Sequence, residues 1–330
     1  MTVPKTMRAL QVADLAPDFA GCGVADVPVP TPGPGQALLR VRAAALGFPD
    51  LLMTEGKYQH RPELPFVPGN DIAGEIVALG DDSADFAVGD AVVATLGTGG
   101  FADYALCPVH ALRRKPAGMD FDAAAAFGVA YLTAYVSLVR RADIQPGEWL
   151  LVHGAAGGVG LAAVDLGKAL GAKVIAASAS DEKLAAIDEN YAPDAILNIT
   201  DGFREQVKEM TGGGADVIYD PVGGDIFDEN TRCIAFGGRL LVVGFASGRI
   251  ATVPTNIPLI KGFAVVGVRA GEYGRRYPER GEENFDAIWT LAETGKVTPH
   301  VHAALPLDDW RDAFDMMRTR KVVGRVIIAP

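Results

Sequence analysis

The chain has 330 residues, of which 49% are hydrophobic and 22% are charged, and its formal net charge is -11. This length allows two domains with a sizeable core. The acidic balance argues against nucleic acid as a partner, because binding to a phosphate backbone depends on clustered Lys and Arg. The first residues, MTVPKTMRALQV, lack the apolar core of a signal peptide. Cys22, Cys107 and Cys233 are far apart and provide no disulfide framework, so we expect a cytoplasmic protein.

The longest uncharged run covers residues 123–139 and falls just short of a membrane span. It contains several hydroxyl-bearing side chains, which favour the interior of a protein over lipid. We therefore expect a buried helix there, and no membrane association.

The first part of the chain is rich in Gly, Pro and short runs that are typical of strands. Residues 36–47, 71–80 and 90–97 form such runs, and turn-forming sequences such as TPGPG separate them. This pattern predicts a compact, mostly β domain over residues 1–125.

From about residue 126 the pattern changes to alternating strands and helices. Continuous apolar runs, which are typical of parallel strands buried on both faces, recur between helical stretches. These runs lie at residues 149–154, 173–178, 195–198, 216–220, 239–244 and 263–268. They predict a doubly wound α/β domain with a parallel sheet over residues 126–268.

The segment 269–330 loses this alternation. We expect amphipathic helices within residues 278–297 and 307–321, and a closing strand at residues 324–329. The segment is predicted to return to the first domain.

A glycine-rich turn follows the first apolar run of the second domain and precedes a helix. Gly157 and Gly160 fit the second and third glycines of G-x-G-x-x-G, and Ala155 stands at the first position. Gly157 would let the backbone approach a pyrophosphate, which the amide groups of the helix N-terminus attract. The alternative is a glycine turn without a ligand. The predicted cofactor contacts here are Ala156, Gly157, Gly158 and Val159.

Ser178 ends the second strand of this domain, at the place where Asp or Glu would bind the ribose hydroxyls of NAD. Without that carboxylate, a 2′-phosphate is not repelled. Ser180 is expected to cap the next helix, which puts Lys183 in its first turn, where a phosphate would offset the unfavourable helix dipole. The alternative is a solvated lysine beside Asp181 and Glu182. We predict contacts from Ser178 and Lys183, and NADPH as the cofactor.

Several segments together resemble the zinc-independent quinone oxidoreductases, the zeta-crystallin-like branch of the medium-chain dehydrogenase/reductase superfamily. They are PFVPGNDIAGEIVALG (65–80), LTAY (132–135), GAAGGVGLAAVDLGKALGAKVI (154–175), YDPVGG (219–224), VVGFASG (242–248) and GRVIIAP (324–330). The resemblance covers essentially the whole chain. It implies a GroES-like catalytic domain, a Rossmann dinucleotide domain, and a homodimer that pairs through the apolar edge strand near residue 265.

The residues that would bind zinc in related alcohol dehydrogenases are missing. LGFPD (46–50) stands where a cysteine ligand is expected, Asn70 stands where a histidine is expected, and Cys107 is isolated. We therefore expect no metal. Without a metal, hydride addition to a quinone or enone is easier than to a simple ketone, because the charge delocalises into an enolate or a diolate.

The resemblance also implies a motif N-x-x-D, then an arginine and G-x-Y, near the substrate. GFPDLLMTEGKY keeps Asp50, Gly56 and Tyr58, but Gly47 and Thr54 replace the asparagine and the arginine. We predict Tyr58 as the catalytic hydrogen-bond donor, with an amphipathic packing role as the alternative. Asp50 is expected to accept hydrogen bonds within a loop.

His60 and His153 have no acidic partner visible in the sequence, and we expect packing or surface roles for both. The resemblance implies the remaining cofactor contacts, which are Thr133 near the phosphates, Asn198 near the adenosine, Gly244 and Phe245 beside the nicotinamide ribose, and Val268 and Arg269 near the carboxamide.

The leading hypothesis is a zinc-independent, NADPH-dependent reductase that transfers hydride to a quinone or another α,β-unsaturated carbonyl. The proton would come from solvent or from Tyr58. One alternative is an enoyl-thioester reductase of the acrylyl-CoA type, for which Arg61 and the arginines of residues 274–281 could bind CoA phosphates. The other is a non-catalytic, NADPH-binding redox sensor.

Overall fold

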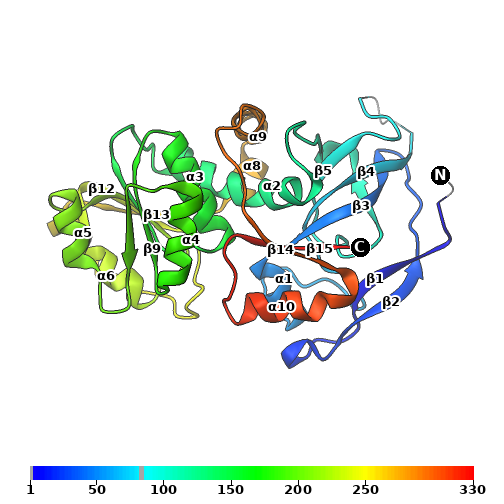
Figure 1. Cartoon of the computed structure of the whole chain (residues 1–330), viewed down its shortest axis with the longest axis horizontal. Coiled ribbons are helices and arrows are strands. Elements are labelled where there is room, and N and C mark those ends of the chain that lie inside the picture. The colour runs from blue at the N-terminus through cyan, green and yellow to red at the C-terminus, as the bar shows by residue number, and fades with distance from the viewer. Residues whose placement is uncertain (1–2, 82–84) are drawn as a thin grey trace. The chain divides into compact units, whose positions relative to one another are not determined.

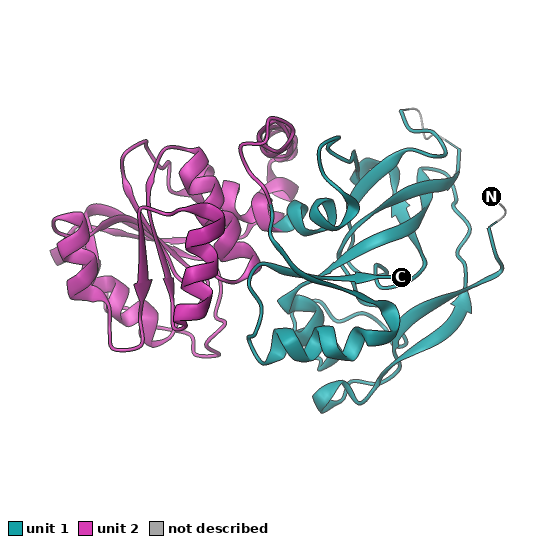
Figure 2. Ribbon diagram, viewed as in Figure 1, with its two compact units in different colours: residues 1–129, 299–330 teal, residues 130–298 magenta. Residues whose placement is uncertain are grey.

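The computed structural model describes residues 3–81 and 85–330 (Figure 1). The chain forms two compact units, shown in Figure 2: unit 1 comprises Met1–Val129 and Pro299–Pro330, and unit 2 comprises Ala130–Thr298. The second boundary lies later than the expected position at residue 269. The reason is a polar attachment: the Arg140 guanidinium binds Asn284 Oδ1 and Glu283 Oε2, both at 2.7 Å, and so holds this part of the tail in unit 2.

Unit 1 is mostly β, as expected. Its main sheet has the strand order β14-β15-β3-β4-β5-β7, with β6 paired to β3, and β1 pairs with β2 in a separate ladder. The closing strand pairs antiparallel with β3, with Val326 opposite Leu46, so residues 299–330 of the tail lie in unit 1. The strands are β1 (Thr6–Val12), β2 (Cys22–Pro28), β3 (Gln36–Leu46), β4 (Asp71–Leu79), β5 (Ala91–Thr95), β6 (Tyr104–Pro108), β7 (Leu112–Arg114), β14 (Val301–Pro306) and β15 (Arg325–Ala329).

The core of unit 1 lies between this sheet and α10 (Trp310–Arg318). Phe314 is fully buried, and its ring meets those of Phe19 and Phe101 edge-on, at centroid distances of 5.1 and 6.1 Å. Such edge-to-face contacts add to the stabilisation from burial of apolar area. Another helix of unit 1, α1 (Phe48–Thr54), contains most of the predicted active-site motif.

Unit 2 contains the expected parallel sheet, in the strand order β10-β9-β8-β11-β12-β13. The strands are β8 (Trp149–Val152), β9 (Lys173–Ser178), β10 (Ala195–Asn198), β11 (Ala215–Asp220), β12 (Ile234–Val242) and β13 (Ala264–Gly267). The order reverses between β8 and β11, so the doubly wound fold is confirmed. In such sheets, ligands bind at the carboxyl ends of the strands near this reversal.

Helices connect these strands. They are α3 (Gly158–Ala169), α4 (Asp181–Tyr191), α5 (Arg204–Thr211), α6 (Asp225–Cys233) and α7 (Asn256–Lys261), followed by α8 (Ala270–Arg276) and α9 (Pro278–Glu293). The apolar run expected to be helical forms α2 (Phe121–Tyr135) and continues as a π-helical turn, η3 (Val136–Arg141). Within the described residues, this stretch is the one helix long and apolar enough to cross a membrane, and 56% of its most apolar window is buried. That degree of burial is typical of a core helix.

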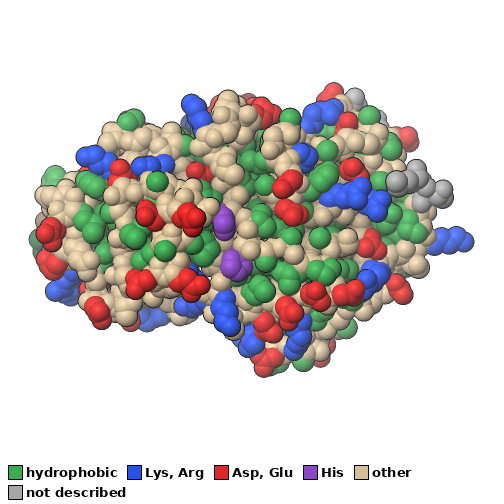
Figure 3. Space-filling model, viewed as in Figure 1, with side chains coloured by type: hydrophobic (Ala, Val, Ile, Leu, Met, Phe, Trp, Pro, Cys, Tyr) green, Lys and Arg blue, Asp and Glu red, His purple; other side chains and the backbone are tan. Residues whose placement is uncertain are grey.

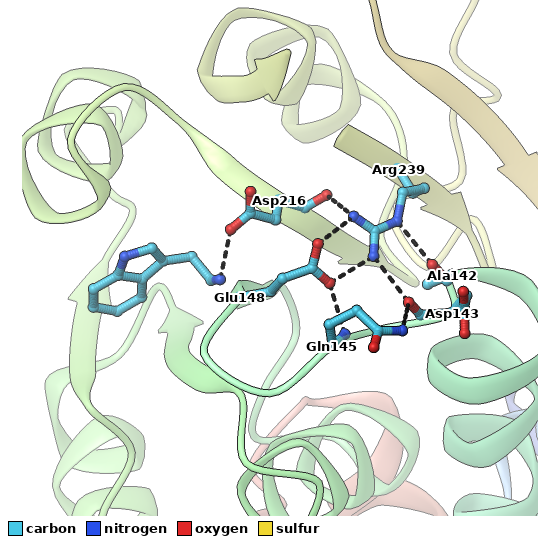
Figure 4. A network of polar contacts seen from close by, with 7 residues as sticks. Ala142, Asp143, Gln145, Glu148, Asp216 and Arg239 are labelled. Atoms are coloured by element: carbon cyan, nitrogen blue, oxygen red, sulfur yellow. Dashed lines mark hydrogen bonds and ion pairs between the residues drawn. The ribbon is translucent and has the colours of Figure 1, made fainter. Parts of the chain in front are cut away.

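A polar network fixes the amino edge of the unit 2 sheet (Figure 4). Arg239 forms two bonds with Glu148, from Nη1 to Oε1 at 2.8 Å and from Nη2 to Oε2 at 2.7 Å. Arg239 Nε also donates to the carbonyl oxygen of Ala142 at 2.8 Å. Asp216 accepts the backbone N–H of Trp149 at 2.8 Å. Because Trp149 and Asp216 lie at the amino ends of β8 and β11, this network is at the opposite ends of the strands from the expected ligand.

Candidate functional site

The glycine-rich turn joins the carboxyl end of β8 to α3, as predicted. Gly157 is the N-cap residue of α3 and is exposed. A Cβ on Gly160 would lie 2.2 Å from the carbonyl oxygen of Gly154, so a side chain would push α3 away from the turn. The amide groups of Gly158 and Val159 lie in the first helical turn, where a helix provides no acceptor for them.

This turn fits the pyrophosphate of a dinucleotide. Its backbone reaches the surface at Gly157, while Ala156 is only 5% exposed and packs beneath it. The free amides and the positive end of the helix dipole point to an anionic ligand. The turn can therefore hold two linked phosphates by its main chain alone.

The loops after β11 and β12 are joined at the same edge of the sheet. The backbone N–H of Ala246 donates to Pro221 O at 3.0 Å, and that of Ser247 donates to Val222 O at 2.9 Å. This pairing carries Gly244 and Phe245, and Phe245 is 44% exposed. A ring exposed to this extent is available to contact a ligand.

The segment after β13 reaches the same edge. The backbone N–H of Val268 donates to Val242 O, the last residue of β12, at 3.0 Å. Val268 is buried, whereas Arg269 is exposed and precedes α8.

Thr133, the predicted phosphate neighbour in α2, is half-buried, and its carbonyl accepts the Ser137 hydroxyl at 2.6 Å.

The end of β9 has the expected local structure. Ser178 is the last residue of the strand, and Ser180 caps α4, with its hydroxyl accepting the Lys183 backbone N–H at 3.4 Å. Lys183 thus lies in the first turn of α4, as predicted. Asn198, at the end of β10, donates from Nδ2 to Asp181 Oδ1 at 2.6 Å and so joins β10 to the same turn.

A buried chain of polar side chains under these loops was not foreseen from the sequence. His153 Nε2 lies 2.7 Å from Asn230 Oδ1, and Asn230 Nδ2 donates to Asp220 Oδ2 at 3.2 Å. The expectation that His153 serves packing alone is therefore incomplete, since Asn230 connects it to a carboxylate. The partners are 77 and 10 residues apart in the chain, so no local motif reveals them.

In unit 1, Asp50 holds the active-site motif together. Its Oδ2 accepts the N–H of Gly47 at 2.8 Å, and its Oδ1 accepts the N–H of Gly69 at 3.0 Å. The predicted role as a loop acceptor is confirmed. Asp50 is 1% exposed, and this burial raises its pKa to about 6, although the two N–H donors oppose the shift.

Tyr58 and Thr54, two other residues of this motif, make mainly local contacts. The half-buried Tyr58 ring packs against the apolar cluster of Val12, Met53 and Phe66. Thr54 is fully buried, and its hydroxyl donates to Leu51 O at 2.8 Å within its own helix. Thr54 therefore does not replace the outward-reaching arginine of the related motif.

Buried charges close to this motif were also missed. Arg325 Nη2 donates to Asp71 Oδ2 at 3.0 Å, and Thr95 Oγ1 donates to Asp71 Oδ1 at 3.3 Å. Asp71 follows Asn70, the residue that stands in place of a zinc-binding histidine. Over residues 3–81 and 85–330, no group of three or more His, Cys, Asp or Glu side chains is placed to hold a metal ion.

Each unit contains a segment that matches a known protein family. Residues 33–117 match the family described as alcohol dehydrogenase GroES-like domain, and residues 158–287 match the family described as zinc-binding dehydrogenase. The quinone oxidoreductase-like protein 2 homolog of Nematostella vectensis is 40% identical over 297 residues, which are 89% of this chain and 81% of that protein.

Solved structures are similar over nearly the whole chain. The quinone oxidoreductase of Thermus thermophilus, which was also solved in complex with NADPH, has a TM-score of 0.84 and 30% identity, covering 98% of this chain and 100% of that one. A structure described as an NAD-dependent alcohol dehydrogenase has a TM-score of 0.89 and 29% identity, with the same coverage. Relatives of this fold are thus described with either nicotinamide cofactor.

Proposed function

We propose that this chain, which belongs to the quinone oxidoreductase branch of the medium-chain dehydrogenase/reductase superfamily, is a zinc-independent reductase that passes hydride from NADPH to a quinone or another α,β-unsaturated carbonyl. The proposal rests chiefly on the turn from Gly154 to Gly160, because the amides of Gly158 and Val159, in the first turn of α3, have no acceptor within the helix and suit a pyrophosphate. When bound, NADPH supplies the hydride. The chain itself binds and orients the reactants.

Relatives of similar fold are described with NAD or with NADPH, so the choice between the two cofactors is argued from local residues. These residues support NADPH. Ser178 ends β9 without the carboxylate that would bind a ribose diol and repel a 2′-phosphate. Lys183 lies in the first turn of α4 and supplies a cation there. Together they favour a phosphorylated adenosine ribose.

Zinc independence is proposed from the side chains at the two ligand positions. Gly47 has no side chain, and its N–H is held by Asp50. Asn70 carries an amide, which binds zinc poorly compared with imidazole or thiolate. Without a Lewis acid, acceptors that spread the incoming charge over a conjugated system are the easier substrates.

Tyr58 remains the proposed donor of the proton that completes the reduction. Its ring packs on an apolar cluster but stays half-exposed, which is compatible with a hydroxyl that faces a substrate. Gly47 has no side chain and the Thr54 hydroxyl is bonded within its own helix, so neither provides the donor that is proposed for Tyr58.

The enoyl-thioester alternative receives less support. Arg275 and Arg276 both bind the Glu272 carboxylate, at 3.1 and 2.8 Å. Arg280 donates to the Tyr273 hydroxyl at 3.2 Å. Because Glu272 offsets part of the charge of Arg275 and Arg276, these contacts favour a quinone over a substrate with CoA phosphates.

Oxidation of NADPH with two acceptors in parallel tests the function. The purified protein is mixed with NADPH and either a naphthoquinone or a short 2-enoyl-CoA, and the loss of reduced-nicotinamide absorbance is followed. We expect faster oxidation with the quinone. Faster turnover of the thioester would replace the quinone assignment by the enoyl-thioester alternative. Tight NADPH binding without turnover of either acceptor would replace both by the redox sensor.

We further propose that two copies pair through β13, which is an edge of the described sheet. Val265 on this strand is 38% exposed, and Leu259 and Phe236 nearby are 81% and 88% exposed. Exposed apolar edges are covered in stable proteins. Val265→Lys should convert a dimer to a monomer in analytical ultracentrifugation. A wild-type monomer would contradict the proposal.

We propose neither nucleic acid nor a membrane as a partner. Figure 3 shows Lys and Arg side chains distributed among acidic ones on the visible face. A mixed surface with a net charge of -11 offers little attraction to a phosphate backbone. The three free cysteines are compatible with the proposed cytoplasmic location.

A further inference from the structure

We propose that Asn230 is a positioning residue for the dinucleotide, because it links His153, next to the glycine turn, to Asp220, which shapes the neighbouring loop. This inference rests on the proposed function in one respect, namely that the loops hold a nicotinamide dinucleotide. It assigns a role to the side chain of a residue of α6.

The three side chains are among the most deeply buried polar groups of the described chain. His153 and Asn230 are 0% exposed and Asp220 is 1% exposed. The bonds of 2.7 Å and 3.2 Å that Asn230 makes are therefore shielded from water. A buried polar group that loses its partner incurs the full penalty of desolvation. The protein thus depends on Asn230 to satisfy both neighbours.

The carboxylate fixes the direction of this chain. Asp220 can only accept, so the amide nitrogen of Asn230 must face it, and the amide oxygen must face His153. His153 therefore carries its proton on Nε2, and Nδ1 has no partner among the described residues. Burial lowers the pKa of His153, which keeps the ring neutral. The carboxylates of Asp220 and Glu229 oppose this shift by raising the pKa of His153. Glu229 also accepts the Phe203 N–H at 3.4 Å.

The other oxygen of Asp220 determines the shape of the loop after β11. Asp220 Oδ1 accepts the N–H groups of Val222 and Gly223, both at 2.8 Å. The carbonyls of Pro221 and Val222 then hold the loop that contains Phe245. Loss of the Asn230 bond would free the carboxylate to rotate, and both loops would lose their common anchor.

The same chain reaches the glycine turn from the other side. His153 immediately precedes Gly154, and a Cβ at Gly154 would lie 3.4 Å from side-chain atoms of both Pro221 and Val222. The turn and the loop thus lie in contact, and the chain through Asn230 sets their spacing from below. A displacement of about 1 Å at such a site is enough to impair binding or reaction strongly.

Asn230→Asp provides a sharp test, because the new side chain has the same shape. A protonated carboxyl can donate to Asp220 and accept from His153, as the amide does, whereas the ionised form has no proton to donate. Burial and the adjacent carboxylate raise the pKa of the new group. We expect NADPH affinity close to that of the wild type at about pH 6 and at least about tenfold weaker at about pH 9.

The affinities of NADPH and NADH are measured by fluorescence titration across this pH range, with thermal unfolding at each pH to establish that the variant is folded. The matched control is Asn190→Asp, at an exposed asparagine of α4, whose affinity should follow that of the wild type. A purely structural role for Asn230 would lower the unfolding temperature without producing this divergence in affinity.

The outcomes separate the two proposals. Wild-type protein that binds neither nucleotide would overturn the proposed function, and this inference with it. Wild-type binding together with an Asn230→Asp variant that parallels it at every pH would overturn this inference alone. If Asn230→Asp does not fold, His153→Gln is compared with His153→Leu, since only glutamine can donate to Asn230. The leucine variant should bind at least about tenfold more weakly, and equal affinities would contradict the inference.

Discussion

Gly160 approaches Gly154 so closely that a Cβ at residue 160 would lie 2.2 Å from the Gly154 carbonyl oxygen. Gly160→Ala must therefore displace α3 from the turn whose amides are proposed to bind the pyrophosphate. We expect a loss of roughly 1–3 kcal/mol in the free energy of unfolding and at least about tenfold weaker NADPH binding. The control is Gly118→Ala, where a Cβ meets no atom within 4 Å. Equal behaviour of the two variants in denaturant unfolding and NADPH titration would contradict this packing.

Asp165 ties together the two ends of unit 2. Its Oδ2 accepts both the Tyr131 hydroxyl and the Thr298 N–H, the latter at 2.8 Å. Burial is the main reason that its pKa rises to about 6, above the value of about 3.9 in an unfolded chain. The native state therefore holds this proton more tightly, so the stability that Asp165 contributes falls as the pH rises from about 4 to about 6.

Asp165→Asn removes this titration but keeps an oxygen for both donors, because they share one acceptor atom. The variant should gain in unfolding temperature relative to the wild type as the pH rises from about 5 to about 7.5. Thermal unfolding at both pH values measures the difference. The control is Asp286→Asn, at an exposed position of α9. A difference that is the same at both pH values would show that burial does not hold the proton on Asp165.

Cofactor preference should depend on Ser178 and Lys183. Ser178→Asp places a carboxylate where the 2′-phosphate is proposed to lie, so we expect NADPH to bind at least about tenfold more weakly while NADH binds equally or better. Lys183→Ala should weaken NADPH alone. Lys173→Ala, at the opposite end of β9, is the control. Dissociation constants for both nucleotides give the ratio, and an unchanged ratio in both variants would remove the basis for NADPH.

Tyr58→Phe tests the source of the proton. Phenylalanine keeps the ring packing on Val12, Met53 and Phe66 but removes the hydroxyl. General acid catalysis contributes roughly 10²–10⁴-fold, so we expect kcat with an enone acceptor to fall at least about tenfold while KM for NADPH is unchanged. Steady-state kinetics separates these parameters. An unchanged kcat would assign the proton to solvent and the ring to packing.

The strands of unit 2 were predictable wherever a continuous apolar run ends at clear turn residues. β9 and β10 begin and end at the expected residues. β12 begins at Ile234, earlier than expected. Phe236 is 88% exposed and Gly237 has a φ of 79°, which is typical of a turn, so the local sequence does not indicate a strand there. The pairing of Ala215 with Ile234 across a register shift makes this stretch a strand. No local pattern contains that information.

The candidate site likewise contains features that were predictable from the local sequence and contacts that were not. The turn at Gly157 and the helix cap at Ser180 depend on neighbours in sequence, and both have the expected local structure. The supporting bonds do not. Arg325 and Asp71 are 254 residues apart, and Asn230 meets His153 only because α6 packs under the sheet. Such contacts follow from the tertiary fold, so a single sequence does not predict them.

The most direct test of the account is the rate of NADPH oxidation with a naphthoquinone before and after removal of metal by a chelator. Metal content is measured on the same samples, so that rate and zinc can be compared. We expect the same kcat in the chelated protein, because Gly47 and Asn70 stand at the positions of the zinc ligands. A rate that disappears on chelation and returns with added Zn²⁺ would contradict the proposal that this reductase works without a metal.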